Sequence, residues 1–153
     1  MKILSFFVAL ALAWFGYRHL TGPIAHAPGA LVAAEPQQLE VAEALPLIEH
    51  GDFRLKPLAR FALTARVLHR RNYSFDRGAK LSPTDLALGW GSMSDSQVLE
   101  QLKISQSNRF YWYRFQLPPP IPQEEIARQS TNVHIIPADR AIARQCAPYE
   151  QAS

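Results

Sequence analysis

His134 is the residue on which acid–base chemistry in this sequence would depend. It lies between Val133 and Ile135 in an apolar run, and a half-buried imidazole titrates close to neutral pH, as a general base or metal ligand must. In a hydrolase-like site its partners would be the carboxylates of Asp95 and Asp139. The alternative interpretation is a core histidine whose ring bonds a neighbouring strand, and we favour this second interpretation.

The motifs that would accompany such chemistry are missing from the sequence. There is no Gly-x-Ser-x-Gly nucleophile elbow, no phosphate-binding glycine loop, and no His-x-x-x-His or His-Glu-x-x-His pair. The single cysteine, Cys146, excludes an internal disulfide framework and a cysteine-based zinc cluster. We therefore expect no metal and no cofactor, and we expect a binding protein rather than an enzyme.

Basic and aromatic residues give a stronger signal. Eight Lys and Arg residues lie between Arg54 and Lys80 against Asp76 alone, and a run of aromatic residues extends from Phe110 to Phe115. A basic face attracts acidic proteins or anionic head groups, whereas aromatic side chains with Arg could also stack bases. The competing interpretation is a solvated strand face balanced by the acidic segment 35–52. The predicted binding residues are Arg66, Arg70, Trp90, Arg109, Tyr111, Trp112 and Arg114.

The N-terminal segment is apolar from Ile3 to Tyr17 apart from Ser5 and Gly16, and Lys2 and Arg18 flank it. Fifteen helical residues rise about 22 Å, which is short for a bilayer core of about 30 Å but lengthens if Arg18 snorkels. Residues 1–20 are thus predicted to be a transmembrane anchor or a signal segment, with residues 3–20 in the membrane. We expect a single-pass protein of the bacterial inner membrane with a periplasmic body, or a secreted protein if the segment is cleaved. Nucleic acid is an unlikely partner for such a body.

The rest of the chain divides by composition. With 153 residues and 48% hydrophobic content, it has room for one folded domain. Residues 21–38 are rich in proline and alanine and are predicted to be a linker. The domain is predicted over residues 39–145 and a flexible tail over residues 146–153.

Periodicity and capping signals predict an α+β fold with antiparallel strands after the N-terminal transmembrane or signal helix. Strands are expected near residues 60–70, 109–117 and 132–136. Helices are expected near 83–88, 95–103 and 122–129. The residues expected to be mostly buried are Phe61, Leu63, Val67, Leu86, Trp90, Leu99, Leu102, Ile104, Tyr111, Tyr113, Ile126 and Ile135.

Three segments of the sequence are distinctive. They are Gly-Trp-Gly-Ser-Met-Ser-Asp at 89–95, Ile-Ser-Gln-Ser-Asn-Arg-Phe-Tyr-Trp at 104–112 and Ser-Thr-Asn-Val-His-Ile-Ile-Pro-Ala at 130–138. Together they resemble an uncharacterised family of small bacterial membrane-associated proteins. The likeness covers most of residues 52–138 and implies membrane association without implying a reaction. Because the pattern of this family continues into further strands, we expect this chain to be a member shortened at its C-terminus.

Together these features predict a non-enzymatic, membrane-anchored interaction domain outside the cytoplasm. It would contact a protein partner or anionic lipid through its basic face and its aromatic strand. The alternative is an exported hydrolase-like enzyme with a site around His134.

Overall fold

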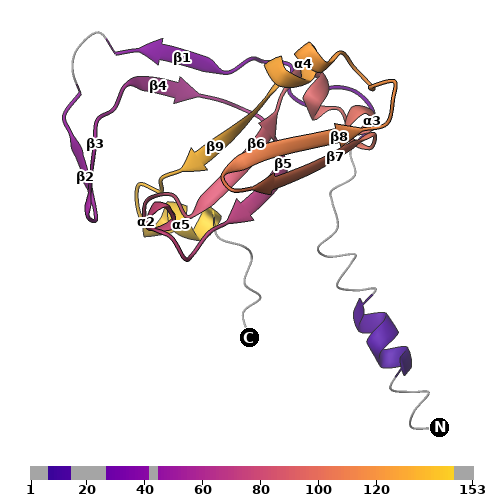
Figure 1. Ribbon diagram of the computed structural model, residues 1–153, viewed down its shortest axis with the longest axis horizontal. Coiled ribbons are helices and arrows are strands. Elements are labelled where there is room, and N and C mark those ends of the chain that lie inside the picture. The colour runs from indigo at the N-terminus through magenta and orange to yellow at the C-terminus, as the bar shows by residue number, and fades with distance from the viewer. Residues whose placement is uncertain (1–6, 15–26, 42–44, 147–153) are drawn as a thin grey trace.

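A three-stranded antiparallel sheet forms the centre of the computed structural model, which describes residues 7–14, 27–41 and 45–146 (Figure 1). Its central strand is β6 (Thr84–Gly89), with β5 (Arg66–Asn72) on one side and β9 (Ser130–Ile135) on the other. In this register Leu86 lies opposite Arg70 on β5 and opposite Val133 on β9. Every residue of β6 except Leu86 is buried, as expected for a central strand.

A second, two-stranded sheet is the hairpin of β7 (Leu102–Ser107) and β8 (Phe110–Phe115), which lies across the central sheet in Figure 1. Its inner face packs on η1 (Gly91–Ser94), α3 (Ser96–Leu99) and α4 (Gln123–Arg128). Met93, Leu102 and Ile126 form the buried core between these elements. The hairpin is therefore covered on one face only.

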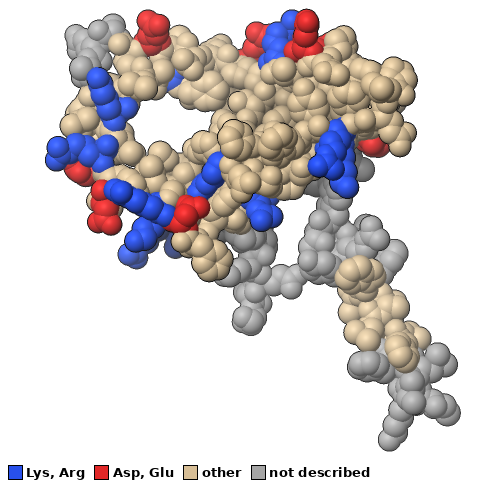
Figure 2. Space-filling model, viewed as in Figure 1, with Lys and Arg blue, Asp and Glu red and all other residues tan. Residues whose placement is uncertain are grey.

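The segment between residues 37 and 62 forms an arm. In it β1 (Gln37–Glu40) pairs with β4 (Ala59–Ala62), and β2 (Ile48–His50) pairs with β3 (Phe53–Leu55). Figure 1 shows these strands running away from the central sheet, and Figure 2 shows an open gap between the arm and the body in this view. Large apolar side chains of the arm, among them Leu39 and Phe61, are more than half exposed.

Two short helices complete the described fold. α2 (Arg77–Leu81) precedes β6, and Asp76 caps it by accepting a hydrogen bond of 2.6 Å from the Ala79 amide. α5 (Arg140–Cys146) follows β9, and the carbonyl of Cys146 accepts a hydrogen bond of 3.3 Å from the Thr84 hydroxyl. This bond ties the last described helix to the beginning of the central strand.

The fold is α+β with antiparallel sheets, but the predicted transmembrane helix is contradicted. Residues 7–14 are helical, and no helix in the described residues is long and apolar enough to cross a membrane. Positions 1–6 and 15–20 of the predicted segment lie outside the described residues, as do 21–26 of the linker and 147–153 of the tail.

Three predicted elements are confirmed with small shifts, namely β8, β9 and α4, and the other three need correction. The helix expected at 83–88 is strand β6, because the capping signal of Ser82 and Pro83 was overridden by burial on both faces. The helix expected at 95–103 ends at Leu99, and β7 begins at Leu102. The strand expected at 60–70 is divided into β4 and β5 by residues 63–65.

The predicted core is partly right. Trp90, Leu102 and Ile126 are buried, whereas Phe61 and Val67 are about half exposed, at 51% and 56%. Phe61 lies on the arm. Val67 borders a register shift in β5, and Leu68, which lies within the shift, packs against the core. The remaining predicted core residues have intermediate exposure.

Candidate binding surface

The uncovered face of the β7–β8 hairpin is the candidate site, and we call it the outer face. Side chains alternate between the two faces of a strand, and here Leu102 and Gln106 point inward and are buried. The side chains that point outward and are exposed are Lys103, Ser105 and Ser107 on β7, with Phe110, Trp112 and Arg114 on β8. The ladder sets them opposite one another in three pairs.

Two aromatic side chains of the outer face are open to solvent. Phe110 is 63% exposed and Trp112 is 52% exposed, and their ring centroids lie 6.1 Å apart in a tilted arrangement. Large apolar rings held next to each other in water are typical of contact surfaces. Ser105 and Ser107 stand opposite them and leave the rings uncovered.

The third pair of the outer face brings together two cations. Lys103 lies directly opposite Arg114 in the ladder, and like charges in this position destabilise a hairpin. Neither cation forms an ion pair within the part of the chain that the structure describes. An anion bound between them would relieve their repulsion.

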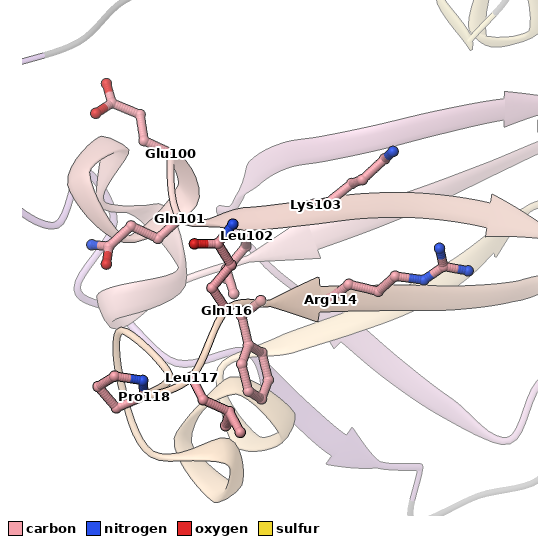
Figure 3. A pocket seen from close by; sticks show the side chains of 9 residues that line it. Glu100, Gln101, Leu102, Lys103, Arg114, Gln116, Leu117 and Pro118 are labelled. Atoms are coloured by element: carbon pink, nitrogen blue, oxygen red, sulfur yellow. The ribbon is translucent and has the colours of Figure 1, made fainter.

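Beyond this pair the outer face continues into an open hollow of about 750 Å³ (Figure 3). In Figure 3, Lys103 and Arg114 extend along the hairpin, away from Glu100 and Gln101 at the other end of the hollow. The apolar part of the wall includes Leu117, which is 84% exposed. The complete lining is Glu100, Gln101, Leu102, Lys103, Arg114, Phe115, Gln116, Leu117 and Pro118.

The side chain of Arg109 fixes the turn of the hairpin to the rest of the fold. Asn108 and Arg109 both have positive φ, at 51° and 67°, as a two-residue hairpin turn requires. The Arg109 guanidinium donates to the Ser82 carbonyl at 2.7 Å and lies 3.8 Å from the ring centroid of Tyr73. These contacts hold a residue other than glycine in the left-handed region, so Arg109 anchors the hairpin instead of reaching outward.

Asp85 is the buried acceptor in the same cluster. Its side chain has no exposed surface, and its Oδ1 lies 3.1 Å from Nη1 of Arg109 and 2.8 Å from Nδ1 of His134. Asp85 and His134 are direct neighbours in the β6–β9 ladder. The side chain of His134 is 50% exposed, so this histidine is paired on one side and open on the other.

The carboxylates predicted as partners of His134 have other roles. Asp95 caps α3 by accepting from the Gln97 amide at 2.9 Å. Asp139 caps α5 by accepting from the Ala141 and Ile142 amides at 2.7 and 2.9 Å. The structure therefore pairs His134 with Asp85, which the sequence analysis did not select.

A chain of buried amides also joins the hairpin to the sheet. Gln106 is 5% exposed, donates to Oδ1 of Asn132, and its Oε1 lies 2.9 Å from Nδ1 of His69. Nδ2 of Asn132 donates in turn to the Arg109 carbonyl at 3.1 Å. The hairpin is thus fixed in place by side chains from both edge strands of the central sheet.

Two of the seven predicted binding residues lie on the outer face. Trp112 and Arg114 lie on the outer face, whereas Trp90 is buried and Tyr111 lies on the inner face. Burial raises the pKa of Tyr111 above its usual 10.0, and the Ser130 hydroxyl opposes this shift in part.

The predicted arginines of β5 lie away from the outer face. Arg66 donates to the Ser94 carbonyl at 3.0 Å and to the Ser96 hydroxyl at 2.8 Å, so it links β5 to η1 and α3. Arg70 is exposed on β5. In Figure 2 the Lys and Arg side chains form separate groups, without one continuous basic face in this view.

Four residues of the outer face were not among the predicted binding residues, namely Lys103, Phe110 and the two serines, Ser105 and Ser107. The alternation of β8 is the signal that could have found Phe110, because it shares a face with Trp112 and Arg114. Lys103 was assigned to a helix, and this assignment hid its pairing with Arg114. No group of three or more His, Cys, Asp or Glu side chains suited to a metal ion occurs within the described ranges.

Comparisons of the chain with protein-family models, with curated proteins and with solved structures give no significant match.

Proposed function

We propose that this protein is a non-enzymatic interaction domain that binds an anionic partner through the outer face of the β7–β8 hairpin. The observation that carries the proposal is the Lys103–Arg114 pair, two cations that face each other beside the exposed ring of Trp112. The proposal includes no transmembrane anchor.

Two physical arguments support binding at this face. Trp, Tyr and Arg side chains contribute most to the affinity of many protein contacts. An aromatic ring such as that of Trp112 buries a large area at a small cost in side-chain entropy. Opposed like charges lower the stability of the hairpin, and a bound anion would recover that free energy. The polar contacts beneath the turn keep this face rigid, which lowers the entropy lost on binding.

Titration of anionic probes against variants of the outer face tests the proposal. The probes are poly-L-glutamate, a thymidine oligonucleotide and vesicles of phosphatidylglycerol in phosphatidylcholine. We expect at least one probe to bind, and Lys103→Glu combined with Arg114→Glu to weaken its affinity by about tenfold or more. The control is Lys56→Glu combined with Arg140→Glu, which changes the net charge equally at exposed positions on the arm and on α5. Equal losses in both double variants, or no binding of any probe, would refute the proposal.

A second candidate function is hydrolysis with His134 as the general base. The 2.8 Å contact between Asp85 and Nδ1 of His134 favours it, because a buried carboxylate that accepts from Nδ1 leaves Nε2 free to take a proton. His134 does not line the hollow of Figure 3. It also does not line a second, smaller hollow, which is formed by Glu35, Pro36, Phe61, Trp90, Arg128 and Thr131. For this reason we place binding first.

Activity assays on aryl esters decide between the two functions. If His134 is a general base, His134→Gln abolishes hydrolysis while the hairpin double variant retains it. If the protein acts by contact, the wild-type protein shows no hydrolysis above the buffer rate, and His134→Gln leaves the binding of anionic probes unchanged.

A further inference from the structure

We infer that the partner of the outer face is an extended protein segment with the alternating pattern apolar–x–acidic–x–large apolar. This inference rests on the proposed function and specifies its ligand. It is drawn from the order of the surfaces along the outer face, which are aromatic, then cationic, then apolar.

The outer face presents three kinds of surface in a line. The rings of Phe110 and Trp112 come first, the cation pair of Arg114 and Lys103 follows, and the hollow with exposed Leu117 comes last. Along β8 the outward side chains occur at every second residue, about 6.8 Å apart. A segment extended along the hairpin presents its own side chains with the same period. An apolar residue over the rings and an acidic residue at the cation pair therefore bring the next outward residue over the hollow, whose wall includes Leu117.

Each position then has a definite preference. An apolar or aromatic residue would cover the rings of Phe110 and Trp112. A carboxylate would lie between Lys103 and Arg114 and neutralise a pair that is otherwise self-repelling. A large apolar residue would enter the hollow and cover Leu117, whose side chain is 84% exposed.

The charges at the hollow favour a peptide over a polyphosphate. Only two cations face outward on the hairpin, and Glu100 lies at the far end of the hollow, where it would repel a continuing line of phosphates. Nucleic acid is held by grooves with many cations along the backbone. A protein segment needs one acidic side chain at this surface and benefits from the apolar wall that follows.

Two blocked peptides and their permuted controls test this inference with the full chain. The probes are acetyl-Gly-Phe-Ser-Glu-Ser-Leu-Gly-amide and the reversed order acetyl-Gly-Leu-Ser-Glu-Ser-Phe-Gly-amide, which cover both chain directions. In the controls one serine and the glutamate exchange places, so composition and charge stay equal while the alternation is lost. We expect one alternating peptide to bind about tenfold or more tightly than its control in isothermal titration calorimetry.

Variants of the protein complete the test. Leu117→Ser and Trp112→Ser change exposed side chains, so both variants are expected to fold, and each should lower the affinity of the alternating peptide by about tenfold. Phe75→Ser is the matched control, because Phe75 is fully exposed elsewhere, and it should bind like the wild type. Circular dichroism of all three variants confirms that the fold is kept.

The outcomes separate this inference from the proposed function. Equal affinity for alternating and permuted peptides, or full affinity in Leu117→Ser, would overturn the segment pattern. If the oligonucleotide or the vesicles bind in a way that depends on Lys103 and Arg114 while neither peptide binds, the proposed function stands and the peptide inference is wrong. If the hairpin double variant binds every probe like the wild type, both are wrong.

Discussion

Nδ1 of His134 lies 2.8 Å from Oδ1 of Asp85, and the two residues are direct neighbours on strands β9 and β6. The same carboxylate oxygen lies 3.1 Å from Nη1 of Arg109 in the turn of the hairpin. One buried oxygen thus joins the central sheet to the hairpin that carries the outer face. The stability of this junction and the position of the outer face are therefore linked.

Asp85→Asn is expected to destabilise the protein by about 2–4 kcal/mol, because it removes the charge that pairs with Arg109 and His134 inside the fold. Urea unfolding followed by circular dichroism measures the change. Asp95→Asn is the matched control. It makes the same chemical change at a helix cap, where Asn and Asp are nearly equivalent. Equal stability of the two variants would contradict the role assigned to Asp85.

Substitutions at Arg109 separate backbone strain from side-chain contacts. Arg109→Ala and Arg109→Gly lose the same guanidinium contacts, but only alanine keeps a Cβ atom at a φ of 67°. We expect the glycine variant to be more stable than the alanine variant by about 1 kcal/mol in urea unfolding. An alanine variant of equal or greater stability would show that the turn adopts a different backbone conformation.

Because Ile126 is buried and Val67 is exposed, replacing each with alanine should lower the free energy of unfolding by different amounts. Ile126→Ala should cost about 2–5 kcal/mol, because Ile126 is completely buried between α4 and the hairpin. Val67→Ala should cost less than about 1 kcal/mol, because Val67 is 56% exposed. Thermal or urea unfolding of both variants gives the comparison. A larger loss in Val67→Ala would contradict the register of β5.

Tyr111 is expected to make the stability of the fold depend on alkaline pH. Burial raises its pKa above the usual 10.0, so the folded protein keeps the phenolic proton at a pH where the unfolded chain loses it. The contribution of this group is complete below pH 10.0 and is lost as pH rises through the folded-state pKa. The free energy of unfolding therefore falls as the pH rises above 10.0.

Replacing Tyr111 with Phe should remove this part of the alkaline decline. Unfolding free energies measured from neutral pH to about pH 11 for Tyr111→Phe and the wild type test the expectation. Tyr113→Phe, two residues along the same strand, serves as the control for general alkaline unfolding. If the wild type and Tyr111→Phe lose stability in parallel, the burial of this hydroxyl has no energetic consequence.

Local signals predicted the elements whose patterns are complete within a few residues. The aromatic run of β8, the acidic first turn of α4 and the apolar residues of β9 are all readable without their neighbours. The error at β6 arose because Ser82 and Pro83 resemble a helix start, while the burial that makes a strand there comes from β5 and β9. The register shift between Val67 and His69 likewise changes which face of the sheet the later side chains of β5 point to.

The candidate site was less predictable than the fold, because it depends on register. Trp112 and Arg114 were found from their residue types alone. Their neighbours across the hairpin follow only from the pairing of β7 with β8, so Lys103 could not be connected with Arg114. The same holds for Asp85 and His134, which lie 49 residues apart in the chain and meet only through the ladder of β6 and β9.

Amide chemical-shift mapping with the alternating peptides is the most direct test of the central claim, that the outer face is the binding surface. The account predicts that the largest shifts occur at Lys103, Ser105, Trp112 and Arg114 and extend to Leu117 at the hollow. It also predicts little change at His134 and along the arm. Shifts concentrated at His134, or on β1 and β4, with the amides of β7 and β8 unchanged, would contradict the account.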